Sequence, residues 1–141
     1  FQDKYELIEW IIKSELLEPI KPLLNAGMIF EAIVLMLNNI SANSVFYKKA
    51  LKLEGAVTFN QIAMKCVYEM FMNIINEKST GKKSKYRWLT PEVISTYYAQ
   101  SLCFITEGWI AQGMDDIEPK EMAEAYMYLI TRSMDDILSE L

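Results

Sequence analysis

Histidine is missing from the 141-residue chain, and cysteine occurs only twice. Without histidine the chain lacks the commonest general base, the usual activator of a nucleophile and the commonest metal ligand. Cys66 and Cys103 lie far apart among apolar neighbours, so they indicate neither a disulfide framework nor a zinc site and fit a reducing cytoplasm. The sequence also shows no glycine-rich phosphate loop. We therefore predict a protein that is not an enzyme and that carries no metal and no cofactor.

Long hydrophobic runs and an excess of positive charge are also missing. The most apolar stretch, Met28 to Leu37, is too short to span a bilayer and is typical of a buried helix. The net charge of −5 argues against direct binding of nucleic acid by this chain. At 141 residues and 52% apolar content, the chain is long enough for a core of its own. We expect one domain over residues 1–141 and no membrane contact.

No segment has the alternating pattern of a β-strand, and the apolar spacing is helical almost throughout. Asp3 with Glu6, and Thr90 with Pro91, have the residues typical of helix starts, whereas Gly113 is typical of a helix end. Pro19 either kinks or ends the first helix. The prediction is an all-α orthogonal bundle of about six helices, over residues 3–18, 28–40, 43–53, 58–78, 90–112 and 119–141.

A basic loop, STGKKSKYRW, follows the fourth of these helices. Residues 79–88 contain Lys82, Lys83, Lys85 and Arg87, together with glycine and serine that indicate a solvated segment. A surface loop without further function is one interpretation. A patch for phosphate or nucleic acid is the other, and a few basic residues are weak support for it.

The last two helices carry more apolar surface than a small domain normally buries. Along one face of the 90–112 helix, large and small residues alternate. Gly108 costs the helix about 1 kcal/mol relative to alanine, and close packing of another helix is the reason we expect for it. We expect an αα-hairpin that pairs with a second copy as a dimeric four-helix bundle. Ordinary packing within one chain is the alternative. The expected interface residues are Tyr97, Ser101, Phe104, Gly108, Trp109, Ala111, Tyr126, Ile130 and Met134.

Both ends of the chain resemble one family of proteins. FQDKYELIEWI is similar to the segment that follows the recognition helix in TetR/AcrR-family transcription regulators, where Phe1, Asp3, Lys4 and Leu7 match the usual pattern. The stretch YYAQSLCFITEGWIAQGM, with the following EPKEMAE, resembles the regulatory domain of the family's Firmicutes subgroup. The matching positions there are Tyr97, Tyr98, Gly108, Trp109, Ile110, Gly113, Met114, Pro119 and Glu121. Residues 25–88 match only in being helical and apolar.

This resemblance implies a fold like that of the TetR C-terminal domain, which binds an effector and dimerises in the bacterial cytoplasm. Residues 1–3 would be the seam to a helix-turn-helix headpiece upstream, and operator DNA would be bound only through that headpiece. The helix that begins at Asp3 would carry the signal between the two parts. The last two helices would form the homodimer.

A pocket among the middle helices is the expected effector site, because methionine and aromatic residues there are typical of adaptable apolar sites. A well-filled core is the other interpretation of each of these residues. The candidate pocket residues are Trp10, Phe30, Phe59, Met64, Tyr68, Phe71, Tyr97 and Phe104. With few charges nearby, the effector would be a small apolar or amphipathic molecule. As an alternative, the chain is a protein-interaction module without a small-molecule pocket, like activators of dihydroxyacetone-kinase operons.

Overall fold

The fold is all-α, as predicted, in a computed structural model that describes residues 2–81 and 83–141. Over these residues it has eight α-helices and one π-helical segment, and no strand. Phe1, part of the expected seam, lies outside the described residues. The elements are α1 (Lys4–Ile11), η1 (Ile12–Leu17), α2 (Lys21–Asn25), α3 (Ile29–Ala42), α4 (Ser44–Leu51), α5 (Phe59–Lys78), α6 (Pro91–Ala111), α7 (Pro119–Thr131) and α8 (Met134–Ser139).

Three of the predicted helix starts are confirmed by side-chain capping hydrogen bonds. Asp3 accepts a hydrogen bond from the Glu6 amide through Oδ1 at 2.8 Å, which satisfies a donor that the first turn of α1 leaves free. Thr58 and Gln61 form a reciprocal capping box at the start of α5. Thr90 caps α6 and is followed by Pro91 in its first turn, where the missing proline amide is not needed.

Pro19 ends the first helix rather than kinking it. After α1 the chain continues as the π-helical segment η1, in which the Glu18 amide donates to the Lys13 carbonyl five residues earlier at 2.8 Å. In an α-helix the Glu15 carbonyl would pair with the amide of residue 19, which proline lacks. The Asn39 side chain of α3 supplies the missing donor, with Nδ2 lying 3.1 Å from the Glu15 carbonyl oxygen.

The Glu15 carboxylate joins η1 to α4 as well. Its Oε2 accepts from Asn43 Nδ2 at 3.2 Å and from the hydroxyl of the fully buried Tyr47 at 3.4 Å. The axis of α4 is bent by 89° from that of α3, and Tyr47 points back into the core from it. Burial and the nearby Glu15 carboxylate raise the pKa of Tyr47, so the ring keeps its proton as a donor.

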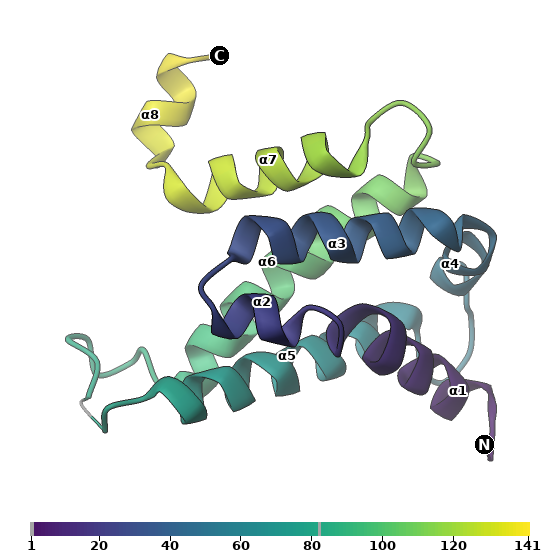
Figure 1. Ribbon diagram of the computed structural model, residues 1–141, viewed down its shortest axis with the longest axis horizontal. Coiled ribbons are helices and arrows are strands. Elements are labelled where there is room, and N and C mark those ends of the chain that lie inside the picture. The colour runs from purple at the N-terminus through teal and green to yellow at the C-terminus, as the bar shows by residue number, and fades with distance from the viewer. Residues whose placement is uncertain (1, 82) are drawn as a thin grey trace.

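The long helices α5 and α6 pack against each other over the greatest length, and α3 crosses in front of α6 (Figure 1). The last long helix, α7, lies along α3 on the side away from α5. Fully buried alanines on α3, α6 and α7 (Ala32, Ala99 and Ala123) let these helices approach closely. The core therefore lies between α5 and α7, with η1 closing one side.

The structure corrects two details of the predicted C-terminal region. An αα-hairpin was expected, but α7 packs mainly along α3 and meets α6 over a shorter length. The single helix expected over 119–141 is broken, because Arg132 is extended at φ −110° and ψ 149°. Ser133 then caps α8 by accepting from the Asp136 amide at 3.2 Å. The Ser-x-x-Asp spacing was the sequence signal for this break.

Candidate functional site

A cleft of about 450 Å³ lies between α3, α5, α6 and α7 and is partly open to solvent. Its volume falls in the range typical of pockets for small molecules, roughly 300–1,000 Å³. The residues that line it come from five helices and from the turn before α2: Ile20, Leu24, Ile29, Ala32, Ile33, Met36, Met70, Phe71, Ile75, Ile94, Tyr98, Leu102, Tyr126, Met127, Ile130 and Thr131.

Among the described residues that line this cleft, none is charged and three carry hydroxyl groups. The Tyr126 hydroxyl is 2.8 Å from Ser101 Oγ, and Thr131 Oγ1 donates to the Met127 carbonyl at 2.6 Å. Burial raises the pKa of Tyr126, which keeps its hydroxyl neutral. A polar group without a hydrogen-bond partner in such an apolar wall would destabilise the fold, and these two hydrogen bonds avoid that cost. The cleft is therefore suited to an uncharged apolar or amphipathic molecule.

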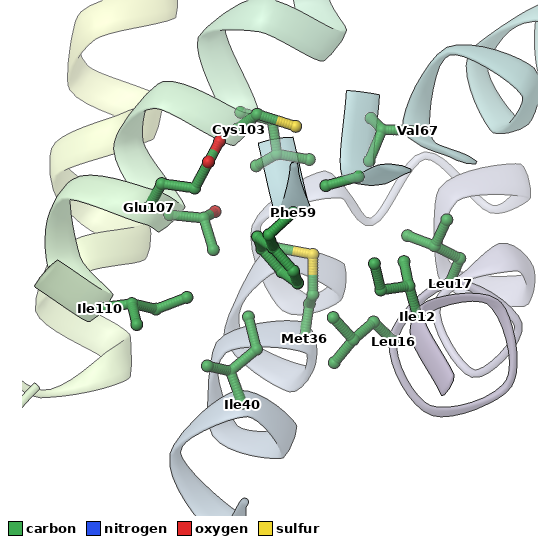
Figure 2. A pocket seen from close by; sticks show the side chains of 13 residues that line it. Ile12, Leu16, Leu17, Met36, Ile40, Phe59, Val67, Cys103, Glu107 and Ile110 are labelled. Atoms are coloured by element: carbon green, nitrogen blue, oxygen red, sulfur yellow. The ribbon is translucent and has the colours of Figure 1, made fainter. Parts of the chain in front are cut away.

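A second, smaller cavity of about 30 Å³ lies deeper in the core, beneath η1 (Figure 2). Ile12, Leu16 and Leu17 of η1 form one wall, and Cys103 and Glu107 of α6 lie opposite (Figure 2). Burial raises the pKa of the Glu107 carboxyl, which also accepts from Asn60 Nδ2 at 2.6 Å. The cavity is too small for an organic ligand and leaves the core beneath η1 incompletely filled.

Met36 and Leu102 line both the cleft and the small cavity. Both side chains are almost completely buried, so they form the partition between the two spaces. Methionine is flexible and adapts to irregular volumes. A change of the Met36 rotamer therefore has free volume available on either side, toward the cleft or toward η1.

Comparison with known families shows which kind of protein contains this cleft and this cavity. The TetR_C_8 family, described as the transcriptional regulator C-terminal region, matches residues 28–132. The chain belongs to this TetR family. The matched range includes every lining residue of the cleft except Ile20 and Leu24. No curated protein sequence matches the chain significantly.

Only one of the eight candidate pocket residues, Phe71, lines the cleft of this TetR-family domain. Phe59 lines the small cavity, whereas Trp10, Tyr97 and Phe104 are more than half exposed. The remaining three, Phe30, Met64 and Tyr68, are half-buried against the core. The cleft residues that we missed are mainly aliphatic ones on α2, α3 and α7. They share no motif, and only the crossing of the helices brings them together.

The expected interface residues fall into two groups. Tyr97, Phe104, Gly108, Ala111 and Met134 are exposed, and Ser101 and Ile130 are half-buried. Tyr126 is buried and bonded to Ser101 within the chain. Trp109 is 2% exposed, and its Nε1–H donates to the Ile117 carbonyl at 2.8 Å, which fastens the α6–α7 turn. The side chains of Trp109 and Tyr126 therefore serve the chain's own core.

A group of ion pairs fastens α1 to α5. Lys65 Nζ lies 2.8 Å from Glu9 Oε1, and Lys13 Nζ lies 3.8 Å from the same oxygen and 3.3 Å from Glu69 Oε2. The hydrogen bond from Lys65 is the main reason why the pKa of Glu9 lies below its ordinary value, while burial opposes it. These side chains are partly exposed, so their attraction is modest and sensitive to salt.

The remaining chemistry of the described residues is sparse. Burial raises the pKa of Cys66 to about 11 and of Cys103 to about 12, so both thiols are protonated and unreactive at neutral pH. Over residues 2–81 and 83–141, no three side chains of the metal-binding types gather closely enough to hold an ion. No single helix of the described chain is long and apolar enough to cross a membrane, and only α3 with α4, bent by 89°, passes that test as a pair.

Proposed function

We propose that this chain is the effector-binding and dimerisation domain of a bacterial, cytoplasmic TetR-type regulator whose helix-turn-helix part precedes it in the longer protein. The observation that carries the proposal is the uncharged cleft of about 450 Å³ inside the region that matches the family. The cleft is also why we favour a small-molecule effector over a protein partner.

The lining of the cleft defines the class of effector. Burial of apolar surface supplies the affinity, at about 25 cal/mol per Å² removed from water. Tyr98, Tyr126 and Thr131 are the described lining residues with hydroxyl groups that could orient the effector, and the hydroxyls of Tyr126 and Thr131 are each already bonded within the chain. A permanent charge on the effector would be left without a counter-ion among the lining residues. The effector that fits is an uncharged apolar or amphipathic molecule.

The lining of the same cleft includes a residue that directly follows the end of the first helix. Ile20, which is 2% exposed, lines the cleft and immediately follows Pro19, where the helix ends. An occupant that displaces Ile20 or rotates Met36 therefore acts on η1, beneath which lies the free volume of the small cavity. An effector shifts the equilibrium between two positions of α1 only by the difference in its affinity for them.

The exposed face of α6 supports the homodimer. An alanine Cβ placed at Gly108 would meet no atom within 4 Å, so nothing in the chain itself requires glycine there. Phe104 is 69% exposed and Tyr97 is 63% exposed on the same face. A second copy whose helix packs closely at Gly108 would explain both the glycine and the two exposed aromatic rings.

The cleft can be tested with Nile red, an uncharged apolar dye whose fluorescence rises on burial. Ile130→Trp fills the cleft from α7, whereas Leu129→Trp places the same ring one position away, outside the lining. We expect the first change to weaken dye binding about tenfold or more and the second to leave it nearly unchanged. Equal binding by both variants would show that the dye binds elsewhere and would contradict the proposed site.

The dimer can be tested by light scattering coupled to size exclusion at micromolar concentration. We expect a dimer for the parent chain and a weaker dimer for Gly108→Leu, because the leucine would obstruct close packing of the helices. Asn76→Leu adds the same side chain to an exposed position of α5 and serves as the control. A monomeric parent chain would refute the dimer.

A further inference from the structure

The short helix α8 presents an apolar stripe that its own chain leaves uncovered. Met134 and Leu138 are 73% and 58% exposed and, with Ile137, follow helical spacing, and Leu141, two residues after α8 ends, is 94% exposed. Figure 1 shows α8 extending beyond the end of α7, away from the bundle. Asp135 and Asp136 lie between the apolar positions, so the helix is both amphipathic and acidic.

A groove of about 670 Å³ lies at the beginning of α6 and in the segment before it. Trp88, Val93 and Tyr97 contribute to its wall, and Trp88 is 75% exposed. An amphipathic helix that lays its apolar face into an apolar groove is one recurring mode of protein recognition. In Figure 1 the start of α6 lies beside the end of α5 at the lower left, and α8 lies at the upper left.

The charges around this groove are opposite to those of α8. The exposed residues Lys83, Lys85 and Arg87 directly precede Trp88, and Glu92 is the acidic residue among those that line the groove. The helix that would fit this surface is therefore apolar on one side and acidic on the other. The rim charges would assist docking by selecting orientation more than by adding affinity.

We propose that α8 of one copy docks into the Trp88 groove of a second copy, and that the reverse contact forms at the same time. This inference rests on the proposed homodimer and adds to it a pair of outer contacts. Two observations favour a second copy as the occupant. The groove shares Tyr97 with the exposed face of α6, and α8 follows directly from α7, the other helix of the expected interface. The symmetry of a dimer then forms both contacts at once.

The test uses two charge-reversed variants of the whole chain. One carries Asp135→Lys and Asp136→Lys in α8, and the other carries Lys85→Glu and Arg87→Glu beside the groove. Each variant alone places like charges at both contacts, and we expect its dimer dissociation constant to rise about tenfold. In an equimolar mixture, each α8 meets a groove of opposite charge. We therefore expect heterodimers of nearly parental affinity, measured by sedimentation velocity.

The outcomes separate the two proposals. A dimeric parent whose variants dimerise equally well, or whose mixture is no better than the single variants, would overturn the docking of α8 and leave the homodimer standing. A monomeric parent would overturn both. If a chain with all four changes recovers but the mixture does not, α8 binds its own chain and the inference is wrong. Recovery in the mixture excludes a mere loss of α8 helicity, because the mixture contains the same altered helix.

Discussion

The hydrogen bond between Asn39 and the Glu15 carbonyl fixes the end of the first helix, and its loss should be measurable. Asn39 is half-buried, and its Nδ2 lies 3.1 Å from the carbonyl oxygen that Pro19 leaves without an amide donor. Asn39→Ala removes the donor and leaves this carbonyl dependent on whatever water can reach it. An unsatisfied, partly buried carbonyl costs about 1–2 kcal/mol. For a domain of this size the melting temperature should fall by roughly 3–6 °C.

A second substitution makes this prediction specific. Pro19→Ala returns a backbone amide to the position from which an α-helix would donate to the Glu15 carbonyl. On its own it costs about 0.4–1 kcal/mol through the greater freedom of the unfolded chain. In its presence, Asn39→Ala should cost about 1 kcal/mol less than in the parent, because the carbonyl has gained an alternative donor.

Urea denaturation of the parent, the two single variants and the double variant measures this coupling. Equal costs for Asn39→Ala with and without Pro19 would refute the idea that the two residues serve the same carbonyl. The fitted slopes with urea concentration should stay constant, since the surface exposed on unfolding does not change. If the first helix transmits the effector signal, Asn39→Ala should also change how tightly Nile red binds in the cleft.

Three further predictions concern the core, the α6–α7 turn and α1. Val67→Ile should stabilise the chain by up to about 0.8 kcal/mol in urea denaturation by placing one methylene in the small cavity, whereas a loss would mean that the space is not available. Trp109→Phe should destabilise it by about 1–3 kcal/mol, since the Ile117 carbonyl loses its donor, and a change below about 0.5 kcal/mol would contradict this. Because Lys65 lowers the pKa of Glu9 in the folded state, the pair stabilises the fold above the ordinary pKa and ceases to do so as pH falls through the lowered value. The difference in melting temperature between the parent and Glu9→Gln should therefore vanish as pH falls from about 6 to about 3.

Much of the helical architecture could be predicted from local signals. Asp3, Thr58 and Thr90 begin helices because each side chain can accept a bond from an amide in the first turn, and this chemistry lies within four residues. The apolar spacing of residues 28–40 likewise indicated a buried helix. The break at Arg132 was missed although Ser133 and Asp136 signalled it, since the apolar stripe continues across the break.

The composition of the candidate site could be predicted in kind, but its members could not. Middle helices rich in methionine and aromatic residues, with few charges, predict an uncharged site, and the described residues that line the cleft are uncharged. Choosing its residues by size favoured aromatic side chains such as Trp10 and Phe104, which are exposed. The lining depends on α7 lying along α3, a contact between segments about 90 residues apart in the chain.

The sequence by itself determined the class of fold, the helix starts, the lack of histidine chemistry and the family resemblance at its C-terminal end, because composition, capping and spacing are local properties. Only the tertiary structure decided which apolar residues became the cleft and which became the core. It also showed that Trp109 fastens a turn, that Asn39 completes the bonding left open by Pro19, and that Gly108 has no close neighbour in its own chain. The physical reason is that burial depends on how the helices cross, and helical spacing fixes the face of each helix but not its partner.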